Sequence, residues 1–162
     1  MRLLMIRHAT AVPRGAPDMP DDELPLTKQG QRRFRRAAEG LARLMKRPDT
    51  LLTSPLPRAR RTAEIAAKAW GKIEVEEESA LAGGTYNEIA TALGRFPAES
   101  TVAIVGHEPD LSSLLGRLLG TSHGERLTFK KGGAALVDVP GPLTDGGTLA
   151  WYLPPRILRR LA

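Results

Sequence analysis

The sequence predicts an α/β fold, a three-layer α/β/α sandwich around a mainly parallel central sheet. Short apolar runs alternate with stretches of helical periodicity along most of the 162 residues. This length fits one domain spanning residues 1–162, and no repeat or linker divides it. Hydrophobic residues make up 41% and charged residues 26%, which is ordinary globular usage and excludes a disordered chain.

The first half of the chain is predicted to supply two strands and two helices. Leu3–Ile6 is a continuous apolar run, typical of a strand covered on both faces. Residues 11–25 are rich in proline and acids and predict a long loop. Thr27 is placed to N-cap a helix, and residues 49–53 predict the second strand. The inner face of the first helix is expected to carry Phe34, Ala37, Ala38, Leu41, Leu44 and Met45. The second helix is expected over residues 59–70, after Pro57.

The second half is predicted to continue the alternation and to end in a hairpin. Residues 73–76 indicate a short strand, and residues 85–93 a small helix that Gly94 ends. Residues 101–105 form the strongest β-branched run and predict a central strand. A helix follows, with one apolar stripe made of Leu111, Leu114, Leu115, Leu118 and Leu119. Residues 134–139 and 148–153 are expected to pair as an antiparallel hairpin.

Composition excludes several function classes. The absence of cysteine removes disulfides, thiolate metal sites and a thiol nucleophile. No apolar run approaches the roughly 18 residues that span a bilayer, and no signal peptide is evident, so we expect a cytoplasmic protein without membrane association. The net charge of +6 favours an anionic partner, either a phosphate, an acidic protein or nucleic acid. Exposed aromatic residues for base stacking are scarce, which disfavours nucleic acid.

Polar residues follow three of the predicted strands at the point where each ends. These are Arg7-His8, Ser54 with Arg58, and Gly106-His107. Each has an unremarkable interpretation alone: an incidental loop pair, a solvated helix face, or a loop histidine that satisfies backbone groups. Because parallel strands deliver their carboxyl ends to one crevice, the three together predict a site. Two arginines and two histidines suit phosphate, since guanidinium groups match its oxygens and a neutral imidazole is a nucleophile.

Four segments of the chain resemble a known family. They are Arg7-His8, residues 26–30 (Leu-Thr-Lys-Gln-Gly), residues 54–63 (Ser-Pro-Leu-Pro-Arg-Ala-Arg-Arg-Thr-Ala) and Gly106-His107-Glu108-Pro109. Their order and spacing are similar to those of the histidine phosphatase superfamily, which has the phosphoglycerate mutase-like fold. The short length, and the tail that begins at Trp151, resemble its SixA-like branch of phosphohistidine phosphatases.

This resemblance implies roles for five residues. His8 would attack phosphorus and form a phosphohistidine that water hydrolyses. Arg7, Arg58 and a protonated His107 would hold the phosphoryl oxygens, and the backbone amide of Glu108 would add a donor where the next helix opens. No metal or other cofactor is expected, because His8 and His107 lack zinc-ligand spacing and the arginines repel cations.

The implied substrate is phosphohistidine in a signalling protein, and the expected protein is a monomer. A small phosphate ester as substrate, a mutase activity and a non-catalytic phosphate-binding domain remain as alternatives. Larger relatives carry a carboxylic general acid, for which the chain offers only Glu76, Glu77, Glu78 and Glu88 at unconvincing spacings. An imidazole leaving group needs less acid assistance than an alkoxide, which favours phosphohistidine.

The chain departs from the family pattern at two positions. Ala9 stands where glycine is commoner, and Leu24 stands where relatives often carry arginine, so one expected contact is missing. The sequence also has two basic surfaces, on the first helix and in the tail, for which solvated surface is favoured over docking. They comprise Lys28, Arg32, Arg33, Arg35 and Arg36, and Arg156, Arg159 and Arg160.

Overall fold

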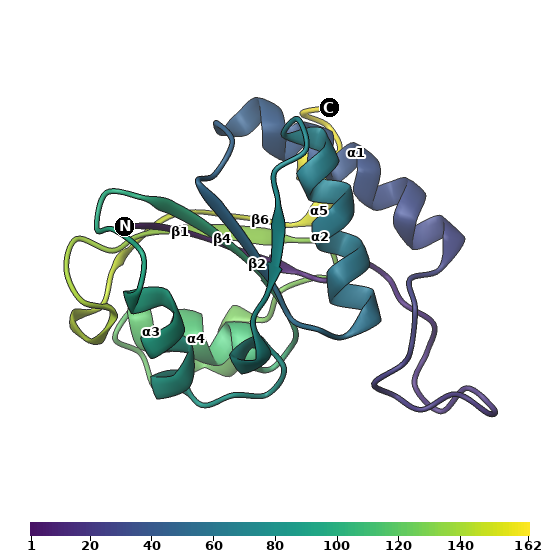
Figure 1. Cartoon of the computed structure of the whole chain (residues 1–162), viewed down its shortest axis with the longest axis horizontal. Coiled ribbons are helices and arrows are strands. Elements are labelled where there is room, and N and C mark those ends of the chain that lie inside the picture. Colours follow the sequence, from purple (N-terminus) through teal and green to yellow (C-terminus); the bar gives the residue numbers. More distant parts are fainter.

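One six-stranded mixed sheet forms the centre of the protein (Figure 1). The computed structural model describes residues 1–162. The strand order is β3-β2-β4-β1-β5-β6. The strands are β1 (Arg2–Arg7), β2 (Thr50–Thr53), β3 (Val75–Glu77), β4 (Thr101–Gly106), β5 (Ala134–Asp138) and β6 (Thr148–Leu153). The first four strands pair in parallel, while β5 and β6 form an antiparallel hairpin that joins the sheet beside β1. The predicted mainly parallel sheet is confirmed.

Helices cover both faces of this sheet, which confirms the predicted sandwich. In Figure 1, α1 and α2 lie on one side of the strands with α5, and α3 and α4 lie on the other. The helices are α1 (Lys28–Leu44), α2 (Pro57–Ala69), α3 (Tyr86–Gly94), α4 (Asp110–Leu118) and α5 (Pro155–Leu158). Thr27 caps α1 as predicted, since its side chain accepts a hydrogen bond from the amide of Gly30. None of these helices is long and apolar enough to cross a bilayer.

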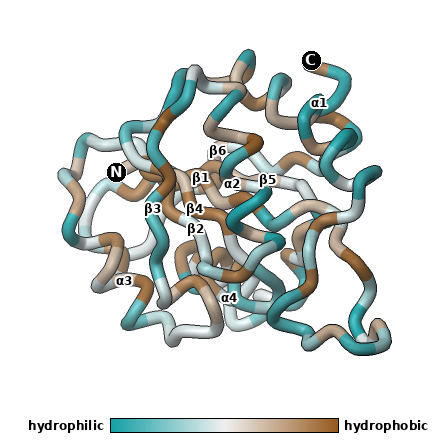
Figure 2. Tube along the Cα trace, turned by 45° about the vertical axis from the view of Figure 1, so that its right-hand side comes forward, coloured by the Kyte–Doolittle hydropathy of each residue, from teal (hydrophilic) through white to brown (hydrophobic).

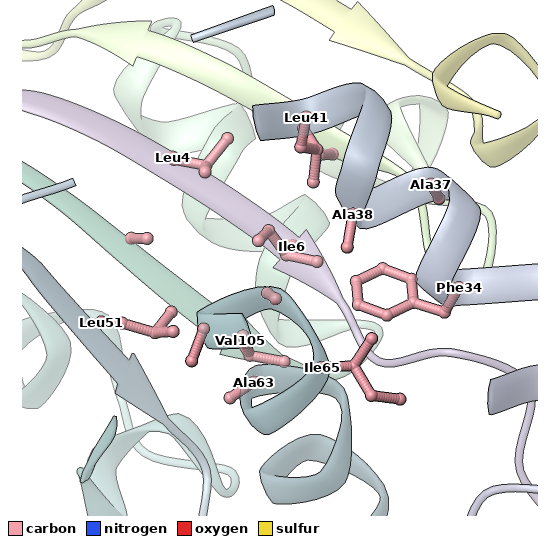
Figure 3. Close-up of a cluster of buried hydrophobic side chains, with 14 of the residues drawn as sticks. Leu4, Ile6, Phe34, Ala37, Ala38, Leu41, Leu51, Ala63, Ile65 and Val105 are labelled. Carbon is pink, nitrogen blue, oxygen red and sulfur yellow. The ribbon is translucent and has the colours of Figure 1, made fainter. Parts of the chain in front are cut away.

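Side chains that alternate along the strands divide the core into two layers. Leu4 and Ile6 of β1 point into the layer under α1 and α2, where they meet Phe34 and Leu41 of α1 (Figure 3). Leu3 and Met5 of the same strand belong to the layer under α3 and α4. All four are fully buried, and each burial stabilises the fold by about 2 kcal/mol. The apolar strands accordingly lie inside the polar outer turns (Figure 2).

Some predicted element boundaries are corrected by tertiary contacts. The third strand is Val75–Glu77 instead of 73–76, because Val75 pairs with Leu51 of β2 while Ile73 packs into the core before the strand begins. Leu44, expected on the inner face of α1, is exposed in the last turn, beyond the part of the helix that the sheet covers. By contrast, α3 ends at Gly94 as predicted, and Arg95 is its C-cap residue.

Parallel pairing determines where the polar strand ends lie. Arg7 pairs with Gly106, and Thr53 pairs with Val105, so β1, β2 and β4 all end at one edge of the sheet. The long loop over residues 11–25 starts from this edge, and it contains only one isolated bridge, between Ala11 and Leu26. This loop extends away from the helices in Figure 1 before it returns to α1. The edge therefore gathers side chains from four distant parts of the sequence.

Candidate active site

Two histidines and an arginine meet at the carboxyl edge of the sheet. The ring centroids of His8 and His107 lie 5.1 Å apart, with the rings tilted by 50°. His8, His107 and Arg58 are each only 7% exposed, which is unusual for polar residues of this size. His8 follows β1, His107 follows β4, and Arg58 lies in the first turn of α2. The structure thus brings together the residues that the sequence placed after three separate strands.

The hydrogen bond of His8 determines which ring nitrogen is free. Its Nδ1 lies 2.7 Å from the carbonyl oxygen of Ala9, which can only accept. Nδ1 therefore carries the hydrogen, and Nε2 keeps a lone pair in the neutral ring. Burial, with smaller effects from the charges of His107, Arg58 and Arg7, lowers the pKa of His8 to about 3, although the hydrogen bond to Ala9 acts in the opposite direction. At neutral pH His8 is an unprotonated nucleophile.

His107 is held by a serine from the neighbouring strand end. Its Nε2 lies 2.8 Å from Oγ of the fully buried Ser54. Burial, followed by the charges of Arg58, Arg14 and Arg7, lowers the pKa of His107 to about 4. The surrounding protein groups therefore leave this ring neutral at pH 7, in contrast to the protonated ring that the family resemblance implied. A phosphate dianion beside the ring would raise that pKa, because opposite charge stabilises the imidazolium ion.

A chain of contacts holds Arg7 in place. Its guanidinium donates to the carbonyl oxygen of Phe129, and the amide of Phe129 donates to Oε1 of Glu108 at 3.1 Å. The other carboxylate oxygen of Glu108 accepts from the hydroxyl of Ser112 at 2.7 Å. Burial lowers the pKa of Arg7, and the charge of Glu108 opposes that effect. The Glu108 side chain thus positions Arg7 indirectly, through the backbone of Phe129.

Arg58 is held by the long loop. One of its terminal nitrogens donates to the carbonyl oxygen of Asp21 at 2.8 Å. Burial and the charge of Arg14 lower the pKa of Arg58, while the carboxylates of Asp21 and Asp22 raise it. Arg14, Asp21 and Asp22 were not predicted as site residues, although Arg14 is the one basic residue in that proline-rich loop. The loop therefore contributes both charges and a hydrogen-bond acceptor next to Arg58.

Buried polar atoms without a protein partner mark the same place. The Nε atom of Arg7 and the Nδ1 atom of His107 are buried and make no hydrogen bond within the protein. A buried unpaired polar group costs roughly 1–3 kcal/mol. Phosphoryl oxygens are acceptors that can satisfy such groups, and they match the guanidinium fork. The chemistry of this cluster is that of an anion-binding site with a nucleophile inside it.

Backbone contacts around His8 restrict its orientation. The His8 amide donates to the Gly106 carbonyl oxygen at 3.0 Å, and the Gly132 amide donates to the His8 carbonyl oxygen at 3.1 Å. The amide of Ala9 donates at 3.0 Å to Oγ1 of the fully buried Thr62, whose hydroxyl donates to the Arg58 carbonyl oxygen. Thr62 therefore ties the His8 segment to the helix of Arg58. Sequence reasoning missed this role of Thr62.

The predicted role of the Glu108 amide needs correction. Helix α4 begins at Asp110, and Pro109 is its N-cap residue, so Glu108 lies before the helix and its amide is not a helix N-terminal donor. That amide makes no hydrogen bond within the protein.

The four glutamates considered as general acids have structural contacts elsewhere. Glu77 pairs with Arg60 at 2.9 Å, and Arg95 pairs with Glu78 at 3.2 Å and with Glu76 at 3.9 Å. Glu88 forms a capping box with Thr85 at the start of α3. None of the four forms a hydrogen bond or an ion pair with His8, Arg7, Arg58 or His107.

The chain matches proteins of one family in sequence. Residues 3–91 match the model of the histidine phosphatase superfamily (branch 1), a segment that includes Arg7, His8 and Arg58. An uncharacterized protein of Picosynechococcus sp. is 35% identical over 136 residues, which cover 82% of both chains.

Solved structures share the fold over nearly the whole chain. The protein histidine phosphatase SixA complexed with tungstate has a TM-score of 0.82 at 24% identity and covers 98% of this chain and 99% of its own. A protein of Nakamurella multipartitia assigned as the phosphohistidine phosphatase SixA has a TM-score of 0.74 at 27% identity, with 95% of both chains covered. An Escherichia coli protein assigned as an alpha-ribazole-5'-phosphate phosphatase has a TM-score of 0.76 at 18% identity, over 96% and 98% of the chains. The sandwich is therefore the phosphoglycerate mutase-like fold, in a SixA-like form.

The family match rests on sequence and covers the ends of β1 and β2, whereas the fold match rests on shape and covers nearly the whole chain. The chain belongs to the histidine phosphatase superfamily.

Proposed function

We propose that the protein is a metal-independent phosphatase that passes through a covalent phosphohistidine on His8 and removes phosphate from phosphohistidine in a protein. One observation carries this proposal. His8 is neutral, its Nδ1 hydrogen is committed to Ala9, and its Nε2 lone pair lies in a cluster with Arg7, Arg58 and His107.

The chemistry runs in two displacements at phosphorus. Nε2 of His8 attacks the phosphoryl group, the bond from phosphorus to the substrate nitrogen breaks, and the departing imidazole takes up a proton. Water then attacks the phosphohistidine, His8 regains its lone pair, and inorganic phosphate leaves with the water oxygen. Arg7 and Arg58 stabilise the negative charge of the equatorial oxygens in both transition states. His107, protonated once phosphate has raised its pKa, donates a further hydrogen bond.

The leaving group favours phosphohistidine over an ester. An imidazole departs readily, whereas an alkoxide needs a proton from the enzyme in the transition state. Among the carboxylates near the cluster, both oxygens of Glu108 already accept hydrogen bonds from Phe129 and Ser112. The four glutamates considered as weak candidates for a general acid pair elsewhere. A substrate that requires little acid assistance fits these side chains.

A specific observation favours a second candidate, a small-molecule phosphomonoesterase. The carboxylates of Asp21 and Asp22 lie close enough to Arg58 to raise its pKa. Asp22 is exposed and forms no ion pair, so its side chain is free to contact the leaving group of an ester. This second candidate keeps the His8 chemistry and changes only the leaving group.

The test uses a phosphotransfer domain labelled with ³²P on histidine. Incubation with the protein should release inorganic phosphate and transiently label the protein with an acid-labile group. His8→Ala should lower turnover by at least about a thousandfold, because the nucleophile is lost. His123→Ala is the matched control, since this exposed histidine lies in a surface turn, and it should keep full activity.

Two results would contradict the proposal in different ways. Turnover of small esters with no release from the phosphoprotein would replace the substrate class with the second candidate. Release that survives His8→Ala would remove His8 from the reaction and with it the covalent mechanism.

A further inference from the structure

A basic cavity lies beside the candidate active site and shares no side chain with it. The cavity has a volume of about 510 Å³. Its cations come from three parts of the chain: Arg33 of α1, Lys130 and Lys131 before β5, and Arg156 and Arg159 around α5. We call these five residues the basic cavity set. Arg7, His8, Arg58 and His107 do not line it.

The charge of this cavity is uncompensated. All five cations are side chains without an ion pair, and none donates a side-chain hydrogen bond to the protein. No acidic residue lines the cavity. Arg60 and Arg61, by contrast, are paired with Glu64. Five like charges around one concavity repel each other, and an anion with several negative charges relieves that repulsion.

The walls of the cavity are well ordered by their own contacts. Gly132 has a φ of 79°, and a side chain there would lie 3.2 Å from the ring of Phe34. Its amide donates to the carbonyl oxygens of both Arg7 and His8 at 3.1 Å. Pro154 and Pro155, with restricted backbones, form the opposite lining next to α5. Lys130 and Lys131 thus lie in a segment whose backbone is hydrogen-bonded to Arg7 and His8 at the end of β1.

We propose that this cavity binds a small molecule carrying two or more phosphate groups. A single phosphate brings at most two negative charges, which is too few to balance five cations. A chain of phosphates can contact arginine forks and lysine ammonium groups on opposite walls together. The volume falls within the range of small-molecule sites, about 300–1,000 Å³. An acidic protein surface suits this concave shape less well, because protein interfaces of ordinary size are broad.

The cavity is a second site, separate from the residues proposed to hydrolyse phosphate. The inference does not depend on the proposed function, since a chain without phosphatase activity would present the same five cations. Because Ala9 and Thr10 also line the cavity, its ligand lies next to the segment that follows His8.

Isothermal titration calorimetry with inorganic triphosphate and with ATP tests the proposal. Both ligands should bind the wild-type protein, more weakly as salt rises from 0.05 to about 0.15 M, because counterions screen the cations. Equal affinity indicates recognition of phosphates alone, and tighter binding of ATP indicates that the nucleoside also contacts the cavity. Either outcome supports the site.

Matched variants locate the binding. Lys131→Glu/Arg156→Glu should weaken the affinity for triphosphate by at least about tenfold. Arg32→Glu/Arg36→Glu changes the net charge equally, but these two exposed residues of α1 do not line the cavity, so binding should be nearly unchanged. Arg58→Ala should also retain binding, because Arg58 belongs to the active site. Circular dichroism checks that each variant is folded.

Three results would overturn the proposal. Binding that Arg58→Ala abolishes and Lys131→Glu/Arg156→Glu keeps would place the anion in the active site. Equal losses of triphosphate affinity in both double variants would show that binding depends only on the net charge of the protein. Absence of binding to the wild-type protein at millimolar triphosphate would exclude the polyphosphate, even if an acidic protein later proved to dock there.

Discussion

At the scale of single residues, Arg58 tests the electrostatic part of the mechanism. Arg58→Ala should lower kcat/KM for phosphohistidine by about 100- to 1,000-fold, because one transition-state donor is lost. Arg58→Lys should restore only a small part of the lost kcat/KM, since an ammonium group lacks the planar fork of donors. Arg60 lies two residues further along α2, and its side chain is exposed. Arg60→Ala is therefore the control and should change the rate less than about threefold. Steady-state kinetics that show equal activity for Arg58→Lys and the wild type would contradict this role of the Arg58 guanidinium in stabilising the transition state.

Asp22 distinguishes the two leaving groups. Asp22→Asn should leave the hydrolysis of phosphohistidine within about threefold of wild type, because imidazole leaves without an acid. If alkyl phosphate esters are substrates, the same change should slow them by about tenfold or more. The two rates are compared on one preparation. A large loss with phosphohistidine would mean that Asp22 protonates this leaving group too.

Residue types and strand positions predicted that Arg7, His8, Arg58 and His107 would lie together, and their catalytic roles stay a prediction from the family resemblance. Arg7 ends β1, His8 and His107 follow β1 and β4, and Arg58 lies in the first turn of α2, so the topology brings them to one edge. Their supporting contacts were not predictable. The link from Arg7 through Phe129 to Glu108 joins residues more than 100 positions apart through backbone atoms, and no side-chain pattern encodes such a contact. The same holds for Thr62 beneath Ala9.

At the scale of secondary-structure elements, a close approach between helices depends on Gly40. A Cβ atom at Gly40 in α1 would lie against the carbonyl oxygen of Leu158 in α5, in a contact that no real Cβ atom makes. Gly40→Ala should therefore destabilise the protein by about 1–3 kcal/mol despite the better helix propensity of alanine. Urea unfolding measures the change.

Gly94→Ala in α3 is the matched control. Nothing lies within 4 Å of a Cβ atom at this position. The substitution should raise the free energy of unfolding by about 0.5–1 kcal/mol, because alanine loses less backbone entropy in a helix. If Gly40→Ala also stabilised the protein, the packing of α5 against α1 would be wrong.

Periodicity predicted the long elements well and the short ones less well. The helices α1 and α2 combine a capping signal with an apolar face, and both were found close to their observed bounds. The short strand β3 has only three residues and is defined by its pairing with β2, which local sequence does not reveal. The pairing of the terminal hairpin with β1 is likewise determined by tertiary contacts that local sequence does not reveal. It leaves β1 in the middle of the sheet.

At the scale of the whole molecule, the two buried histidines link stability to pH. Their folded pKa values of about 3 and about 4 lie below the ordinary value of 6.5. Between these limits the unfolded chain binds more protons, so the free energy of unfolding falls as pH falls. The loss is about 1.4 kcal/mol per pH unit for each histidine that titrates. Urea unfolding at pH 7, 6 and 5 measures this slope.

A double variant isolates the contribution of the histidines. His8→Gln/His107→Gln should unfold with a flatter pH dependence than wild type between pH 6.5 and 4.5. His123→Gln should not change it, because His123 is exposed. Identical slopes for the wild type and the double variant would show that the two rings are not held neutral by burial.

The central claim is that Nε2 of His8 attacks phosphorus, because Nδ1 is committed to the carbonyl oxygen of Ala9. The most direct measurement is ³¹P NMR of the rapidly quenched, phosphorylated protein carrying ¹⁵N-labelled histidine, with the labelled peptide mapped by mass spectrometry. We expect one phosphohistidine, at His8, with phosphorus bonded to Nε2. Phosphate on Nδ1, or on another residue, would contradict it.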